Sequence, residues 1–264
     1  MDKSSLIGII LGIIAVGVGM FLKGVGPEHL INPAAILIII VGTAASVTIA
    51  FPGSTLKKIP ALFKILFTEK KQKSVPELIN LFTEMADAAR KEGILSLETK
   101  IDEIDDQFLA SGLQLAVDGQ SPEFIRDVML EKIDAMEKRH QEGAAIFTQA
   151  GTYAPTLGVL GAVVGLIAAL ADMSDIDAIG HAIAAAFIAT LLGIFTGYVM
   201  WHPFANKLRQ KSKKEVEIKE IMIEGIISIT NGESSKVLRD KLSSYLTTSE
   251  LAKLSQEKNS NEEE

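Results

Sequence analysis

Long uncharged apolar runs alternate along the chain with densely charged stretches. A helix needs about 20 apolar residues, at a rise of 1.5 Å per residue, to cross roughly 30 Å of hydrocarbon. Four runs reach or approach that length, at residues 7–22, 33–51, 144–170 and 178–201. The pattern therefore predicts an all-α, polytopic membrane protein with four transmembrane helices. The first run outlasts the apolar region of a usual signal peptide, so we expect it to remain in the mature protein.

The charged stretches predict helical parts outside the membrane. Apolar residues recur at helical spacing from Leu78 to Ala89 and predict an amphipathic helix that ends near Gly93. After the fourth run, a helix at about 215–229 and a shorter one are expected, and the terminal SQEKNSNEEE is predicted to be disordered. The predicted division is 1–51 with two spans, 52–143 as a helical cytoplasmic domain, 144–203 with two spans, and 204–264 as a helical cytoplasmic tail.

Lysine and arginine residues gather at one end of the four spans. They follow the second span, precede the third and follow the fourth: Lys57, Lys58, Lys64, Lys138, Arg139, Lys207, Arg209, Lys211, Lys213 and Lys214. Because basic loops remain on the cytoplasmic side of a bilayer, both termini are expected in the cytoplasm. The connections 23–32 and 172–177 are expected to face outward from the inner, cytoplasmic membrane.

The composition excludes several classes of function. The 264 residues carry a net charge of −7 and contain no basic patch interleaved with aromatic residues, which argues against a nucleic-acid partner. There are no cysteines, and the four histidines lack a ligand spacing, so neither a metal site nor a cofactor is expected. No enzymatic activity is expected, because no nucleophile beside a base, phosphate loop or paired catalytic carboxylates stands out.

Small residues spaced four apart run along the last two spans. They are Gly158 with Ala162 and Gly161 with Gly165 in one span, and Ala189, Gly193 and Gly197 in the other. Such rows let helix backbones approach closely, either inside one subunit or in the wall of an assembly. Pro155 and Pro203 each remove a backbone donor, so the carbonyls of Gly151 and Val199 are expected to lose their helical partners.

The four apolar runs contain no aspartate, glutamate, lysine or arginine, and His181 lies near the outer end of the fourth. A charge at the middle of a membrane costs at least about 2.5 to 3.5 kcal/mol and is normally kept for a function such as an ion relay. This chain cannot by itself relay protons across the bilayer. In an ion-driven machine, a partner would have to supply the carboxylate.

Four segments carry a resemblance to a known family: MADAARKEGILSLE, AVDGQSPEFIRDVM, TYAPTLGVLGAVVGLIAAL and FIATLLGIFTGYVMWHPFANKLRQKS. Together and in this order they resemble the MotA/PomA family of flagellar motor stator subunits, most of all the Bacillus-type form. The resemblance implies a pentamer around two copies of MotB, a single-span, peptidoglycan-binding partner whose aspartate carries the ion. Spans three and four would face MotB, while spans one and two would lie outside them in contact with membrane lipid.

The resemblance also implies roles for individual residues. Pro155 and Pro203 match the two prolines that couple ion passage to movement in the family, and Thr190 matches a hydroxyl near the ion site. Arg90 and Glu98 match the charged pair that contacts the rotor protein FliG. By themselves, exposed charges on a helix are typical of a solvated surface, so the rotor contact rests on the resemblance.

The coupling ion is predicted from one position. Sodium-driven relatives carry threonine where this chain has Ala162, and a methyl group cannot ligate a partly dehydrated sodium ion. A proton-driven stator is therefore expected, with a sodium-driven stator as an alternative because Thr190 is present. The other alternative is an energiser of envelope processes like ExbB or TolQ. Such proteins resemble only spans three and four and have one span, not two, before the cytoplasmic insert.

Overall fold

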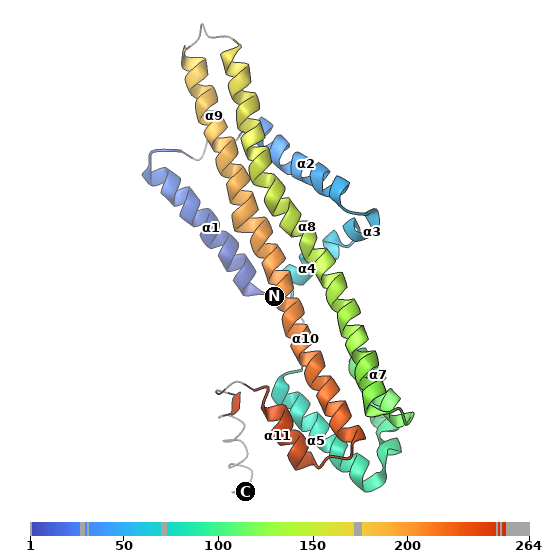
Figure 1. Ribbon diagram of the computed structural model, residues 1–264. Coiled ribbons are helices and arrows are strands. Elements are labelled where there is room, and N and C mark those ends of the chain that lie inside the picture. Colours follow the sequence, from blue (N-terminus) through green and yellow to red (C-terminus); the bar gives the residue numbers. More distant parts are fainter. Residues whose placement is uncertain are drawn as a thin grey trace. The chain divides into compact units, whose positions relative to one another are not determined.

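The computed structural model describes residues 2–26, 30, 32–69, 73–171, 176–246, 248 and 250–251, and their secondary structure is helical throughout (Figure 1). The predicted disordered tail at 255–264 lies outside these residues, as do parts of the connections 23–32 and 172–177. The helices are α1 (Lys3–Leu22), α2 (Pro33–Ala50), α3 (Gly53–Leu56), α4 (Ile59–Phe67), α5 (Val75–Glu92), η2 (Ile94–Leu97), α6 (Glu98–Ile101), α7 (Gln107–Val117), α8 (Pro122–Leu170), α9 (Ile176–Phe195), η3 (Thr196–Trp201), α10 (His202–Thr230) and α11 (Ser235–Ser243).

The chain forms two compact units. The first, here called the span unit, consists of Met1–Lys70 and Arg139–Lys211, and the second, the polar unit, consists of Lys71–Lys138 and Ser212–Glu264. Among the described residues, four helical stretches are long and apolar enough to cross a membrane: α1, α2, α8 and the stretch from α9 to α10. The predicted fold class, all-α with four transmembrane helices, is confirmed.

The local sequence sets the ends of α2. Its first turn is capped by Asn32, whose side-chain oxygen accepts a hydrogen bond of 3.1 Å from the backbone N–H of Ala35. Pro33 occupies the first helical position, where its missing N–H costs nothing. The helix stops at Ala50 because Phe51, which precedes a proline, adopts an extended conformation.

The short helices α3 and α4, which lie within the predicted cytoplasmic stretch 52–143, pack with the span unit. The reason is the amphipathic character of α4, which buries Leu66 completely against α8 and α10 residues of that unit. Four aromatic rings meet there with centroids 5.2 to 6.5 Å apart, those of Phe63, Phe147, Trp201 and Phe204. Such edge-to-face and stacked pairs add to the energy of area burial and fix α4 in place.

The polar unit has its own apolar core, built from α5, α7, α11 and the adjoining parts of α8 and α10. Phe82 of α5 is fully buried, and a Cβ added at Gly225 of α10 would come within 2.6 Å of its ring. Gly112 of α7 approaches Met129 and Ile226 in the same way, at 2.5 and 2.6 Å. Glycine at these two positions therefore lets the helices of the polar unit touch.

The predicted amphipathic helix is α5, which begins with a capping box between Ser74 and Glu77. It buries Leu78 and Phe82 and ends at Gly93. The φ of Gly93 is +87°, a left-handed value that glycine adopts without strain. The prediction of this helix and of its end is confirmed.

Candidate functional site

The last two spans meet backbone to backbone at one pair of the predicted small residues. A Cβ added at Gly193 of α9 would lie 2.7 Å from the carbonyl oxygen of Ala154 and 2.9 Å from the Cα of Gly158. One added at Gly158 would lie 2.8 Å from the carbonyl oxygen of Ala189. Real Cβ contacts are essentially never shorter than 3.0 Å, so this crossing admits only glycine at both positions.

The other predicted small residues separate into two groups. Gly161 has ordinary contacts, at 3.7 and 3.8 Å, with Ile38 of α2 and Ala189, whereas Gly165 has nothing within 4 Å of an added Cβ. A Cβ added at Gly197 would lie 2.7 Å from Cγ of Pro155 and 2.8 Å from the carbonyl oxygen of Gly151, both in α8. The structure thus brings Gly158, Ala189, Gly193 and Gly197 into one helix contact inside the chain and leaves Gly165 on an open face.

Pro155 lies within α8, which continues through it, and Pro203 is the second residue of α10. Directly before α10 the chain forms a π-helical turn, η3. Such turns are rare and frequently occur at functional sites. Pro203 thus stands beside an irregular turn, whereas Pro155 lies within a continuous α-helix in which it supplies no backbone N–H.

Hydroxyl groups line the same part of the two spans. Thr190, which is half-buried like Ala162, donates a hydrogen bond of 3.1 Å to the carbonyl oxygen of Ala186. Thr152 and Thr156 of α8 are exposed and donate to the carbonyls four residues earlier. Because each hydroxyl hydrogen is donated within its own helix, each threonine oxygen can still accept a hydrogen bond from a neighbouring group.

In the part of the chain that the structure describes, no group of three or more histidine, cysteine, aspartate or glutamate side chains is arranged to hold a metal ion. His181 is exposed in α9, near the end that follows the outward connection. The contact between α8 and α9 is made by backbone atoms of Ala154, Gly158, Ala189 and Gly193, none of which carries an ionisable side chain.

Arg90 and Glu98, the predicted rotor-contact pair, lie at the two sides of one turn. Arg90 is in the last turn of α5, and Glu98 begins α6, with Gly93 and η2 between them. Both side chains are exposed, while Leu97 beside Glu98 is fully buried and anchors the turn. The turn is thus held by the core of the polar unit and presents both charges to solvent.

An ionic cluster that no pattern in the sequence predicted lies at the start of α1. The Asp2 carboxylate is only 12% exposed. It forms ion pairs with the Nζ of Lys207 at 2.9 Å and of Lys211 at 3.0 Å, and it accepts a hydrogen bond from Lys207. Lys211 also donates to the carbonyl oxygens of Ile65 and Thr68, at the C-terminal end of α4. The cluster ties the beginnings of α1 and α10 to the end of α4, and only the fold brings these segments together.

Burial alone raises the pKa of the Asp2 carboxyl, but the hydrogen bonds from Lys207, Ser4 and Lys211 outweigh it and hold that pKa well below its usual range. The polar unit contains a second such group, Glu224 of α10. Burial raises its pKa, and Arg126 at 2.7 Å and Lys241 at 3.0 Å lower it by more. Both carboxylates are ionised at neutral pH; Asp2 joins α1 to α10, and Glu224 joins α10 to α8 and α11.

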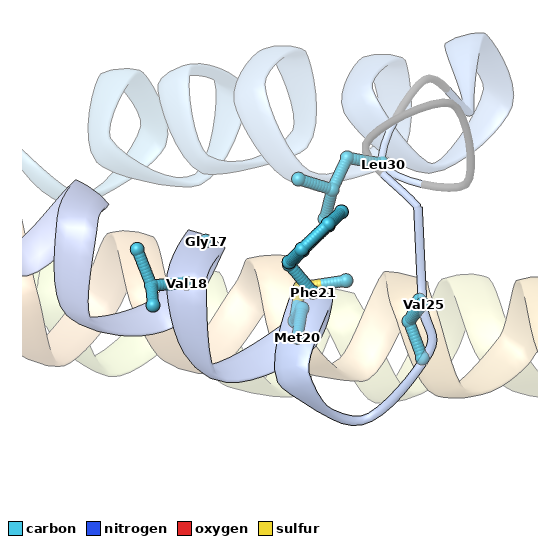
Figure 2. A pocket seen from close by; sticks show the side chains of 6 residues that line it. All are labelled: Gly17, Val18, Met20, Phe21, Val25 and Leu30. Carbon is cyan, nitrogen blue, oxygen red and sulfur yellow. The ribbon is translucent and has the colours of Figure 1, made fainter.

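A hollow of about 300 Å³ opens at the C-terminal end of α1 (Figure 2). It is lined by apolar residues and glycine: Gly17, Val18, Met20, Phe21, Val25 and Leu30. No predicted site residue lines it, and its walls offer no group for catalysis or for binding an ion.

Comparison with protein families matches residues 100–221 to the MotA/TolQ/ExbB proton channel family. The chain is 62% identical to Motility protein A of Bacillus subtilis (strain 168) over 257 residues, which are 97% of this chain and 95% of that protein. The chain belongs to the MotA/TolQ/ExbB proton channel family. Because the similarity to a motility protein runs through all four spans, the chain is a flagellar stator subunit within this family.

Solved structures agree with this assignment. The chain matches a chain of the flagellar MotAB stator complex from Bacillus subtilis with a TM-score of 0.92 and 62% identity, over 96% of this chain and 99% of that one. It matches a chain of C. jejuni MotAB with a TM-score of 0.89 and 31% identity, over 94% and 97% of the two chains. The resemblance noted from the four sequence segments is confirmed.

Proposed function

We propose that this stator subunit assembles as five copies around two copies of a MotB-type partner and converts proton flow into rotation of the flagellar rotor. The observation that carries the proposal is the contact between α8 and α9, a close-fitting wall without a carboxylate to carry the proton. A partner must bring that group, and the solved relatives named above are MotAB complexes, which supports a partner of the MotB type. Neither an enzymatic step nor a metal or cofactor belongs to the proposal.

The proposed topology places both termini in the cytoplasm and the spans in the inner membrane. The basic residues that follow α2 and accompany α10 support this orientation. No side chain of α1 is buried within the chain, which is expected of a helix whose surroundings are lipid and neighbouring subunits. The solvated polar unit then faces the rotor.

Protons are the proposed coupling ion. Ala162 presents a methyl group, and Thr190 offers a single hydroxyl oxygen, fewer ligands than a partly dehydrated sodium ion requires. Cells that depend on this stator should swim equally well in sodium-free medium and stop when a proton ionophore is added. Sodium-dependent swimming that persists in the ionophore would establish the sodium-driven alternative instead.

Arg90 and Glu98 are proposed to contact FliG. Exposed charges steer and align a transient contact without holding it tightly, which suits a partner that must be released at every step. Arg90→Glu and Glu98→Lys should each reduce swimming speed while leaving the amount of stator in the membrane unchanged. Unaltered motility in both variants and in the double variant would refute this contact.

The division of labour between the two subunits is tested in lipid vesicles. A proton gradient should persist in vesicles that contain this chain alone and should dissipate when the chain is reconstituted with its MotB-type partner. A partner with asparagine in place of its membrane aspartate serves as the matched control and should leave the gradient intact. Rapid proton leakage through the chain alone would contradict the proposal.

A further inference from the structure

The turn of α8 that contains Pro155 touches the π-helical turn η3 of the span unit. Pro155 interrupts the backbone hydrogen bonds of α8, and η3 is the π-helical turn between α9 and α10, the helices that run beside α8 in Figure 1. A Cβ added at Gly197, within η3, would lie 2.7 Å from Cγ and 2.9 Å from Cδ of the Pro155 ring. The ring is therefore seated directly on the backbone of Gly197, and a larger residue would displace it.

The carbonyl that Pro155 deprives of its partner lies in the same contact. The oxygen of Gly151 would be 2.8 Å from a Cβ at Gly197, so the Cα–H of Gly197 covers it. Gly151 in turn lies against the His202 ring, which a Cβ added at Gly151 would approach to 2.8 Å. One turn of α8 is thus enclosed between η3 and the first residue of α10.

The arrangement depends on the π-helical form of η3. A π turn inserts one residue into a helix, and removing that insertion would rotate the preceding turns by about 100°, because an α-helix has 3.6 residues per turn. Such a rotation would move Gly197 away from the proline ring. Glycine inside a helix also costs about 1 kcal/mol relative to alanine, so its presence here requires a reason that the seat for Pro155 supplies.

We infer that Gly197 is a positioning residue for energy coupling, which seats Pro155 on η3 so that movement of α8 at Pro155 is passed directly to α10. The inference rests on the proposed stator function and on the coupling role that the family resemblance implies for Pro155. It goes beyond that role because it links this proline to the start of the helix that carries Pro203, through a single contact. Gly197 itself touches neither the ion nor the partner's carboxylate in this scheme.

The test compares Gly197→Ala with Gly180→Ala, a change in the same helical stretch where an added Cβ has nothing within 4 Å. The full chain is studied in membranes together with its MotB-type partner, by hydrogen exchange of the backbone amides in residues 196–203 and by swimming speed. Overpacking a helix contact shifts a local opening equilibrium roughly tenfold or more. We expect that increase in exchange, with loss of swimming, for Gly197→Ala and neither effect for Gly180→Ala.

Pro155→Ala provides an independent variant that fits a helix and removes the ring atoms from the contact without adding bulk. Exchange in 196–203 should rise here too, because η3 loses the ring that rests on it. Unchanged exchange in this segment for Pro155→Ala, or for a membrane-inserted Gly197→Ala, would overturn the inference. Normal swimming of Pro155→Ala would instead refute the proposed coupling role, so the two failures are distinguishable.

Discussion

Replacing Gly193 by alanine tests whether the small residues of the spans pack within the subunit. The new Cβ would lie 2.7 Å from the Ala154 carbonyl oxygen and 2.9 Å from the Cα of Gly158. Both are backbone atoms, so the contact cannot be relieved by turning a side chain. Ordinary contact begins at 3.4 Å, and the two helices must therefore separate by roughly 0.7 Å, a gap that forfeits a quarter to a half of the dispersion energy between their facing atoms.

The expected loss of stability follows from two opposing effects. Overpacking costs up to about 3 kcal/mol, and exchanging glycine for alanine in a helix regains about 1 kcal/mol. A net loss of about 2 kcal/mol should lower the thermal unfolding midpoint of the detergent-solubilised chain by roughly 4 to 8 °C. Circular dichroism at 222 nm during heating measures this shift.

Gly165→Ala is the matched control, because an added Cβ there meets nothing within 4 Å. This variant should unfold at the wild-type temperature or slightly above it, since only the helix propensity changes. If Gly193→Ala is as stable as the wild type, or if Gly165→Ala is the less stable of the two, the close crossing of α8 and α9 is not the contact described. A Gly165→Ala subunit that is stable but does not co-purify with its partner would identify that glycine as part of an assembly surface.

Three further changes test other contacts. Asp2→Asn should lower the unfolding midpoint by several degrees, because it leaves Lys207 and Lys211 half-buried without their carboxylate; an unchanged midpoint would mean that the cluster contributes nothing to stability. The pKa of Glu224 is lowered in the folded protein, so its contribution is present above the unfolded pKa of about 4.3 and lost as the pH falls below it. Unfolding midpoints from pH 8 to pH 3 should therefore fall less steeply at the acid end in Glu224→Gln than in the wild type, and parallel curves would contradict this. Gly225→Ala should destabilise the polar unit, since the added Cβ would come within 2.6 Å of the Phe82 ring, and proteolysis of the polar unit should accelerate. The control is Gly53→Ala, where an added Cβ has nothing within 4 Å; Gly119→Ala is unsuitable because the φ of Gly119 is positive.

The sequence predicted the spans and α5 well because the forces that decide them are local. A run of about 20 uncharged apolar residues must satisfy its backbone groups internally in lipid, and a helix is the form that does so within one segment. For α5, the apolar spacing from Leu78, the cap at Ser74 and the terminal Gly93 all indicate the same helix. The packing of α4 with the span unit could not be predicted from its own residues, since its apolar face has a partner only once Phe147 and Phe204 are brought beside it.

The amino-acid sequence by itself determined that this chain is a four-span helical protein with an uncharged membrane core, because hydropathy and helix signals act within one segment. The tertiary structure alone decided which small residues touch: Gly193 meets Gly158 and Gly197 meets Pro155, while Gly165, in an equally regular pattern, faces open space. It also decided that Asp2 would bind lysines some 200 positions away along the chain. Such contacts depend on the distance between helices and on their rotation about their own axes, quantities that the spacing of residues within one helix does not contain.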